Sequence, residues 1–443
     1  MTGLALRSLR HRSTAFLATF VTVLLGTALI GSFATLAETA TGPVSDVDAE
    51  TLMIMGAVVG GWGALIVLFS VASTMGITVR QRATEIGLLR TVGATPRQAR
   101  RLIRAEALLV SVVAAALGAA LAWPGGRALL ALVRSGDMVA GDVAFGGGPA
   151  SLGLSALGVV TVAMVATGIA GRRAVRGPAT LVIAESRAEG GRMRWWRVAA
   201  GLLMIAYAVG MGVLTVTVTA HDDDPYAAMQ TSGSAGILAA IGLAALAPVL
   251  LRWAGTLART LVGSGATGHL ASYNTTRRAH LLAGVLGPVI VLTATATGTL
   301  MAVGIDGRTL TGGAEGDRDV ITLLNNVVTG MITLFAAIMV VNAFAAVLSD
   351  RRQELHRLHL VGATEAQVRG SVLAEAGIVA AAGVVLGTLA SLATVVPFAI
   401  ARDEGVVPDG QLWLPPLVVV GAVLLTLGSA RGALRRVRPE PVR

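Results

Sequence analysis

The stretch RATEIGLLRTVGATPRQARRLIRAE (residues 82–106) returns later in the chain as RRQELHRLHLVGATEAQVRGSVLAE (residues 351–375). The two copies align without a gap and share the turn sequence Val-Gly-Ala-Thr and a closing Ala-Glu. Gly118 recurs in the same register as Gly387. A repeat of this kind indicates that the chain is built from two related halves. We call residues 82–106 the first segment and residues 351–375 the second segment.

Each segment predicts a short helix, a tight turn and a second helix. In the first segment, Gly93 follows the last apolar residue of a helical pattern, where glycine ends a helix because it adopts the left-handed conformation at little cost. Thr95 then stands at the start of a new helix with Gln98 three residues later, which is the sequence of a capping box. The second segment has the same residues in the same places: Gly362, Thr364 and Gln367.

The composition is that of an integral membrane protein. Of the 443 residues, 54% are hydrophobic and only 14% are charged, whereas soluble chains are about 25% charged. Apolar runs of about 20 residues mark spanning helices, and they predict an all-α protein with about ten transmembrane helices. The predicted spans are 14–37, 52–79, 104–123, 152–171, 198–220, 233–251, 281–305, 320–348, 371–400 and 412–430.

The predicted outer connections are short. Pro124 and the glycines after it predict that the third span ends there, followed by an outer loop over 124–150 that holds a short helix from Gly126 to Val133. The longest outer connections are 38–51, 124–151 and 306–319. None has room for a folded domain, so we expect no large extracellular domain.

The arginines predict the orientation of the chain in the membrane. All 35 basic residues are Arg, and the net charge is +10. If the N-terminus is cytoplasmic, only five arginines lie outside, in agreement with the positive-inside rule: Arg127, Arg134, Arg308, Arg318 and Arg402. We therefore expect both termini in the cytoplasm, an N-terminal interfacial helix before an uncleaved first span, and lipid rather than nucleic acid as the partner of the basic residues.

The sequence lacks the residues that several kinds of chemistry need. It contains no cysteine, which excludes disulfides, thiolate metal sites and cysteine nucleophiles. It also contains no lysine, so the chain has no Walker A loop and is not by itself a P-loop ATPase. No catalytic motif and no cluster of histidines with carboxylates appears, so we expect neither an enzyme nor a metal site.

Glu106 and Glu375 are the carboxylates placed well inside a predicted spanning pattern, and they correspond under the repeat. One interpretation is an ion pair with the arginine that opens each segment, Arg82 or Arg351. Such a pair would hold the first helix of the segment against the second helix. Another is a side chain that reaches back to the membrane interface. A proton relay is a third alternative. Ser73 and Asn342 also correspond, and they predict a hydrogen bond between helices or a contact with a substrate.

The repeated pattern resembles the FtsX-like permease domain, the membrane subunit of type VII (MacB-like) ABC transporters. The first and second segments carry the resemblance, together with the basic exits RRAVRGPATL (172–181) and ARGALRRVRP (430–439). It implies two pseudo-repeated permease halves of a four-helix type. The expected domains are an interfacial helix with the first span (1–50), a first permease domain (51–181), linking spans (182–319) and a second permease domain (320–443).

The resemblance also implies a function. An FtsX-like permease works with a separate cytosolic ABC ATPase, here in two copies that carry the ATP and Mg, while this chain holds no cofactor. The chain would export a hydrophobic or amphipathic compound, such as an antimicrobial peptide, drug or lipid, from the plasma membrane of a bacterium. The alternative is a mechanotransmitting signalling subunit that controls an extracellular or membrane accessory protein without moving a solute.

The resemblance assigns ATPase docking to both segments. The residues implied in the first are Arg82, Glu85, Leu89, Gly93, Ala94, Thr95 and Gln98, and those in the second are Arg351, Glu354, Leu358, Gly362, Ala363, Thr364 and Gln367. The copies differ at two positions of the first helix, where Gly87 and Arg90 are replaced by His356 and His359. We therefore expect the two segments to contact their ATPase subunits unequally.

Overall fold

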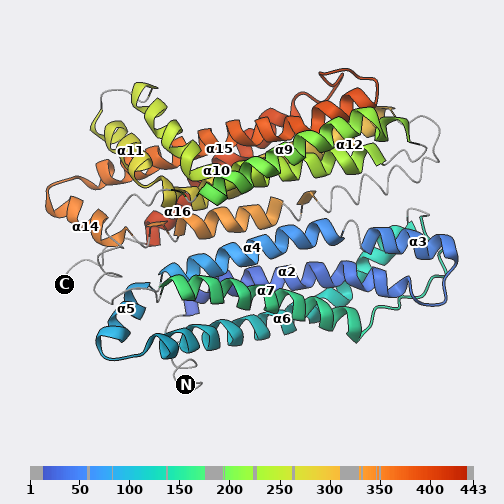
Figure 1. Ribbon diagram of the computed structural model, residues 1–443, viewed down its shortest axis with the longest axis horizontal. Coiled ribbons are helices and arrows are strands. Elements are labelled where there is room, and N and C mark those ends of the chain that lie inside the picture. The colour runs from blue at the N-terminus through green and yellow to red at the C-terminus, as the bar shows by residue number, and fades with distance from the viewer. Residues whose placement is uncertain are drawn as a thin grey trace. The chain divides into compact units, whose positions relative to one another are not determined.

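The structure is a computed structural model (Figure 1), and the residues it describes form helices joined by short connections. These residues are 13–56, 60–81, 83–135, 138–174, 193, 195–222, 227–261, 265–309, 329–330, 333–345, 347–348 and 351–436. They divide into two compact units, one that holds helices α2 to α7 and one that holds helices α9 to α16. The predicted N-terminal interfacial helix lies outside the described residues.

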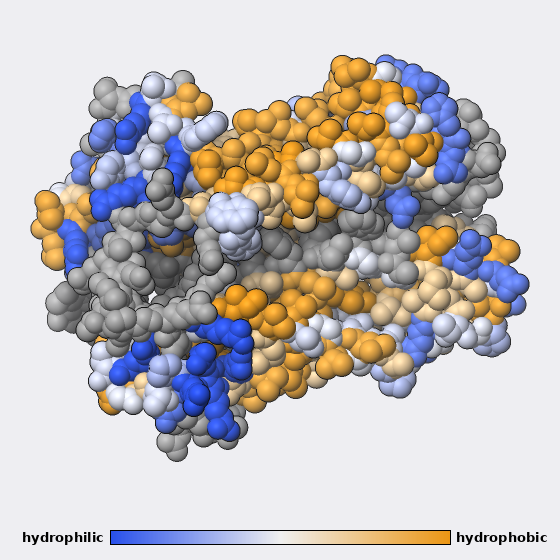
Figure 2. All heavy atoms as spheres, in the orientation of Figure 1, coloured by the Kyte–Doolittle hydropathy of each residue, from blue (hydrophilic) through white to orange (hydrophobic). Residues whose placement is uncertain are grey.

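The prediction of an all-α membrane protein is confirmed. Among the described residues, eight helices are long and apolar enough to cross a membrane. The spans predicted at 52–79 and 320–348 appear as α4 (Gly60–Gln81) and as a shorter apolar helix, Thr333–Ala345, with part of each prediction outside the described residues. In Figure 2, hydrophobic surface covers the middle of the long helices, and hydrophilic atoms gather near their ends.

Unit 1 is a bundle of four long helices in which α2 is central. Helix α2 (Ser13–Thr39) packs along α6 (Pro96–Ser135) and also contacts α4 and α7 (Pro149–Ala174). The contact between α2 and α6 is close because Gly118 faces the Leu24 carbonyl and Thr27. A Cβ atom at Gly118 would lie 2.8 Å from the Thr27 Cβ and would also collide with that carbonyl oxygen.

Unit 2 contains a bundle with the same packing. Helix α12 (Ala279–Thr309) packs along α15 (Glu365–Ala401), and both contact α16 (Leu414–Arg436). Gly387 takes the place of Gly118, since a Cβ there would lie 2.6 Å from the Thr293 Cβ and 2.9 Å from the Ile290 carbonyl oxygen. The repeat therefore extends to the helix α12, which corresponds to α2.

One contact in the two bundles exchanges a large residue for a small one. In unit 1, Gly26 of α2 faces Val67 of α4. In unit 2, Leu292 of α12 joins a core cluster with Ala336 of the Thr333–Ala345 helix. The small residue is on α2 in unit 1 and on the Thr333–Ala345 helix in unit 2, and the large residue faces it in each case. Such volume-conserving changes keep the interface well packed.

Unit 2 has further helices around this bundle. Helix α9 (Trp195–Thr217) packs on α10 (Ala227–Leu261), and α10 contacts both α12 and α15. A short 3₁₀ turn, Thr219–His221, follows α9. Helix α11 (Ala266–Arg277) returns from the end of α10 and packs on α10 and α15, where Ala258, Ala271 and Ile378 form a small buried cluster.

The predicted break at Pro124 is wrong. Helix α6 continues through Pro124 to Ser135, so residues 126–133 extend a spanning helix. The two residues that follow, Gly125 and Gly126, let this part of α6 lie directly against Ser32 and Thr35 of α2. A proline inside a membrane helix is tolerated when neighbouring side chains and close packing stabilise the interrupted turn.

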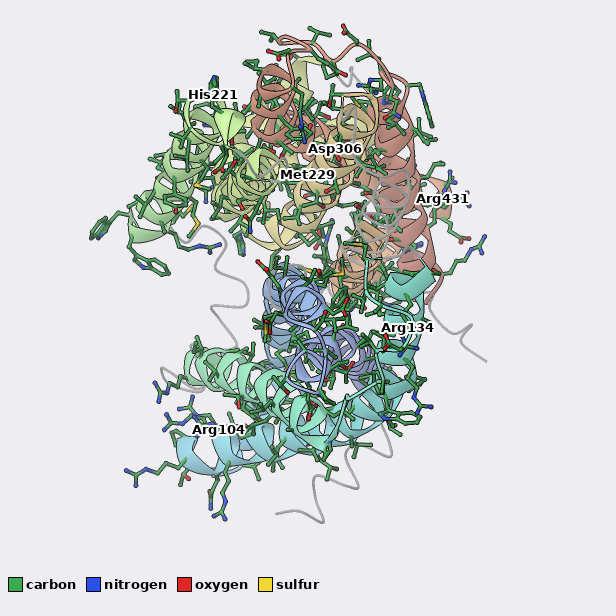
Figure 3. All side chains as sticks on the ribbon, turned by 90° about the vertical axis from the view of Figure 1, so that its right-hand side faces the viewer. Arg104, Arg134, His221, Met229, Asp306 and Arg431 are labelled. Carbon is green, nitrogen blue, oxygen red and sulfur yellow. The ribbon has the colours of Figure 1, made fainter. Side chains whose placement is uncertain are left out.

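In each unit, the end of the bundle opposite the Gly93 or Gly362 turn contains polar contacts between helices. In unit 1, Glu38 Oε2 accepts hydrogen bonds from the backbone N–H groups of Gly148 (2.8 Å) and Ser151 (3.1 Å) at the start of α7. In unit 2, Arg402 donates to Asp306 Oδ1 at 2.7 Å, and Figure 3 shows Asp306 at this end of α12. The connection 38–51 also contains part of helix α3 (Asp46–Ile54) rather than only a loop.

We predict that alanine at Gly118 or Gly387 destabilises the protein, because the added Cβ separates α2 from α6 or α12 from α15. Overpacking of this kind costs about 1–3 kcal/mol, which would lower the unfolding temperature in detergent by a few degrees. Gly158 on the exposed face of α7 has no atom near its Cβ position and provides the matched control. Equal unfolding temperatures for G118A, G387A and G158A would contradict the prediction.

Candidate functional site

Both segments turn at a glycine in the left-handed region. Gly93 has a φ of 104° and Gly362 a φ of 98°. The N–H of Ala94 donates to the Leu89 carbonyl (3.0 Å) and the N–H of Gly93 to the Arg90 carbonyl (3.1 Å). The equivalent bonds at Gly362 and Ala363 have lengths of 3.0 Å. This is the Schellman pattern that ends a helix at glycine, and it confirms the turn expected from sequence.

The capping boxes predicted after each turn are present. Thr95 N–H donates to Gln98 Oε1 at 2.8 Å, and Gln98 N–H donates back to Thr95 Oγ1 at 3.3 Å. Thr364 and Gln367 exchange the same two bonds at 2.9 and 3.2 Å. Each turn is therefore fixed from both sides, by the end of one helix and the start of the next.

The first helix of each segment presents apolar side chains at its tip. These helices are α5 (Ala83–Thr91) and α14 (Arg352–Leu360). Val92 and Val361, which directly precede the glycines, are 88% and 86% exposed. Leu89 and Leu360 are exposed as well, whereas Ile86 and Leu355 anchor each helix in the bundle. The exposed residues form an apolar edge beside each turn.

The two tips carry different charges. Arg97, Arg101 and Arg104 are exposed on the first turns of α6, and Figure 3 shows Arg104 at this edge of unit 1. The corresponding turns of α15 carry the exposed residues Glu365 and Arg369. His356 is exposed, and His359 Nδ1 lies 2.8 Å from the Leu355 carbonyl oxygen. The first tip is therefore strongly basic, while the second is close to neutral.

A buried ion pair stands behind the second turn. Arg351 and Glu375 are 4% and 2% exposed. Arg351 Nη1 contacts Glu375 Oε2, and Nη2 donates to Oε1 at 3.1 Å. The ion pair that the sequence suggested between Glu375 and the arginine at the start of the second segment, Arg351, is therefore present. The pair joins the start of α14 to the third turn of α15.

Three further residues extend this pair into a cluster. Asn274 of α11 donates from Nδ2 to Glu375 Oε1 at 2.7 Å. Glu354 Oε2 contacts Arg278 Nη1 and lies 3.6 Å from Arg351 Nε. We call Asn274, Arg278, Arg351, Glu354 and Glu375 the Glu354 cluster. Sequence reasoning missed Asn274 and Arg278, because no periodicity relates the helix before a span to a repeat about a hundred residues later.

The charge on Arg351 is permanent. Burial by itself lowers the pKa of its guanidinium, but the facing Glu375 carboxylate reverses that effect and raises the pKa above the ordinary value. Arg351 thus remains a cation over the physiological pH range. The cation donates to Glu375 from both of its terminal nitrogens.

The first segment has the same acidic residues in related surroundings. Glu106 is 1% exposed and Glu85 is half-buried, and neither lacks an interaction partner. Arg82, which the repeat aligns with Arg351, lies outside the described residues. The structure therefore describes the acidic residues Glu85 and Glu106 of the first segment but not Arg82.

Ser73 and Asn342 are the remaining residues that the sequence singles out. Asn342 is half-buried, and its Nδ2 donates no hydrogen bond within the described residues. The Ser73 side chain lies outside those residues. No group of three or more His, Cys, Asp or Glu side chains gathers as a metal site in the described part of the chain.

We predict that Glu375→Gln destabilises the protein, because Arg351 would stay buried without a counter-charge. Breaking a buried pair in this way costs about 3–5 kcal/mol, measured as a lower unfolding temperature in detergent. Glu365→Gln, at the exposed start of the same helix, is the control and should cost less than about 1 kcal/mol. A similar fall in unfolding temperature for the two variants would show that the ion pair does not stabilise the packing of α14 on α15.

Comparison with known proteins gives one match. The family model described as FtsX-like permease C-terminal matches residues 57–179 and 326–441. The two matched ranges contain the first and second segments, respectively. No curated protein matches the chain.

Proposed function

The chain belongs to the FtsX-like permease family, whose model matches more than half of it, and we propose that it is the membrane subunit of a type VII (MacB-like) ABC exporter. FtsX-like permeases are multi-pass membrane proteins that work with ABC ATPases and are generally not catalytic themselves. The proposed cargo is a hydrophobic or amphipathic compound, such as an antimicrobial peptide, a drug or a lipid. The proposed location is the plasma membrane of a bacterium.

One observation carries this proposal: each unit presents a capped helical turn with an exposed apolar edge. Val92 and Val361 expose most of their surface beside rigid glycine turns. Exposed valine next to ordered backbone favours a groove on a partner protein, since an apolar edge gains free energy when a groove covers it. We assign that groove to the cytosolic ATPase, one copy for each segment.

The long helices after the turns would carry motion across the membrane. Helix α6 has 40 residues and α15 has 37, so each is on the order of 55–60 Å long at about 1.5 Å per residue. Each starts at a docking turn and continues through the bundle without a break. Closure of two ATPase copies on ATP and Mg would therefore move both helices at their far ends.

The absence of lysine supports a separate ATPase. A Walker A loop places its lysine on the nucleotide phosphates, and the full sequence has none. ATP and Mg would bind only on the partner. The unequal charge of the two tips further suggests that the two ATPase copies are held with different strengths, the basic first tip favouring an acidic rim on its groove.

The arginines and tryptophans support an orientation with both termini in the cytoplasm. Trp195 and Trp196 are exposed at the start of α9, and Trp253 is exposed near the end of α10, from which α11 leads back to α15 of the second segment. Tryptophans at such positions anchor helices at the membrane interface. The segments and the basic residues around them would then share the cytoplasmic side.

A second function is favoured by a specific feature at the opposite end of unit 2. The connection between α15 and α16 exposes Val406, Val407, Leu412 and Trp413. An exposed apolar patch of this kind suits a protein partner. The chain could then act as a mechanotransmitter that controls an extracellular or membrane accessory protein without moving a solute.

We predict that Gly93→Val and Gly362→Val leave the permease folded but uncouple ATP hydrolysis from transport. No atom lies near either Cβ position, so the change acts through the backbone, where a left-handed β-branched residue costs about 1–2 kcal/mol or more. The measurement is permease-stimulated ATPase activity alongside ATP-dependent transport in vesicles. Asparagine tolerates this conformation, so G93N and G362N are the matched controls, and wild-type coupling in the valine variants would refute the role of the turns.

We also predict that the chain co-purifies with the ATPase encoded beside it, as one permease with two ATPase copies. The mass of the intact complex in detergent measures this ratio. Two permeases in the complex would mean that the two halves of one chain do not complete the membrane unit. A chain that binds no ABC ATPase would overturn the proposed function.

A further inference from the structure

The Glu354 cluster connects the second docking turn to the base of α12. Arg278 is the C-cap of α11, and its own carbonyl accepts from the N–H groups of Leu281 (2.9 Å) and Leu282 (3.1 Å) in the first turn of α12. A force on the Arg278 side chain therefore acts on the point where α11 ends and α12 begins. Helix α12 is the most buried of the candidate spans, so a shift at its base affects the packing of the whole bundle.

One oxygen atom serves both arginines of the cluster. Glu354 Oε2 contacts Arg278 Nη1 and lies 3.6 Å from Arg351 Nε. A separation of 3.6 Å is beyond a hydrogen bond, so in this structure Glu354 is held by Arg278. The Glu354 side chain is also 35% exposed, whereas Arg351 is 4% exposed. Glu354 is thus the member of the cluster with room to move.

Arg351 provides a second place for Glu354 to bind. Its two terminal nitrogens are used by Glu375, and Glu375 is fixed further by Asn274. The buried Nε of Arg351 has no hydrogen-bond partner within the described residues. A buried donor without a partner is costly, and a displacement of Glu354 by less than 1 Å toward Nε would satisfy it.

We propose that Glu354 is a two-position relay, bound to Arg278 in the state described and to Arg351 Nε when α14 is displaced. Asn274 and Arg278 are its positioning residues: Asn274 keeps the Arg351–Glu375 pair in place, and Arg278 ties the base of α12 to α14. This inference rests on the proposed function, because docking of the ATPase at the second turn is what would displace α14. In its second position Glu354 would hold Arg351 more closely and Arg278 less closely, which would loosen the tie between α14 and the base of α12 at the moment of ATPase closure.

The relay can be followed by distance measurements between spin labels. The chain has no cysteine, so the pair Tyr273→Cys on α11 and His356→Cys on α14, both at exposed positions, can be labelled specifically. The complex with the neighbouring ATPase is measured in nanodiscs, without nucleotide and with a non-hydrolysable ATP analogue. The relay predicts that the analogue shifts the distance between the labels.

Two variants and a matched control test the residues. Arg278→Gln should keep ATPase binding but abolish the nucleotide-dependent shift. Glu354→Gln should abolish the same shift, and each variant should lower permease-stimulated ATPase activity by about fivefold or more, as expected for a coupling element. Arg277→Gln removes the same charge from the adjacent, exposed residue and should behave like the wild type. Glu354 is partly exposed, so its variant remains a test if Arg278→Gln fails to fold.

The outcomes separate this inference from the proposed function. If the wild-type chain binds no ATPase, the proposed function fails and the relay fails with it. If the wild-type complex forms and shows the shift, but Arg278→Gln and Glu354→Gln keep it, the relay is wrong while the proposed function stands. Loss of stability in the two variants with an unchanged shift would identify the cluster as a brace only.

Discussion

The hydrocarbon of a membrane leaves a spanning chain one way to satisfy its backbone: every N–H and C=O group must bond within the helix or to a close neighbour. Pro124, Pro248, Pro288 and Pro397 all lie inside long helices of this protein. All four helices continue past the proline, and glycines let neighbouring helices pack closely, as at Gly118 and Gly387. Backbone satisfaction and close packing thus give two bundles of rigid rods.

Each segment contains a sharp turn between two helices. A left-handed glycine ends one helix, and a threonine caps the next, so the direction of the chain is fixed without a neighbouring element. The valine before each glycine stays exposed. The two turns therefore present apolar surface in a fixed geometry.

The joint behind the second turn is held by charge rather than by apolar packing. A buried ion pair adds little net stability compared with an apolar replacement, but it fixes geometry because a lone buried charge is so costly. Arg351 and Glu375 therefore hold α14 on α15 in one arrangement, and Asn274 extends the same constraint to α11. Glu354 is the most exposed of the charged side chains in this cluster.

The sequence by itself determined the helical class, the glycine turns and the capping boxes, because these depend on neighbours within a few residues of each other. It also determined the repeat, which is visible as two similar stretches of sequence. It also indicated a partner for Glu375, since the repeat pairs that residue with Arg351. Only the tertiary structure decided that α6 runs through Pro124, because the residues after it pack against Ser32 and Thr35 of another helix. The same holds for Asn274 and Arg278, which meet Glu375 and Glu354 through packing between helices that no local pattern encodes.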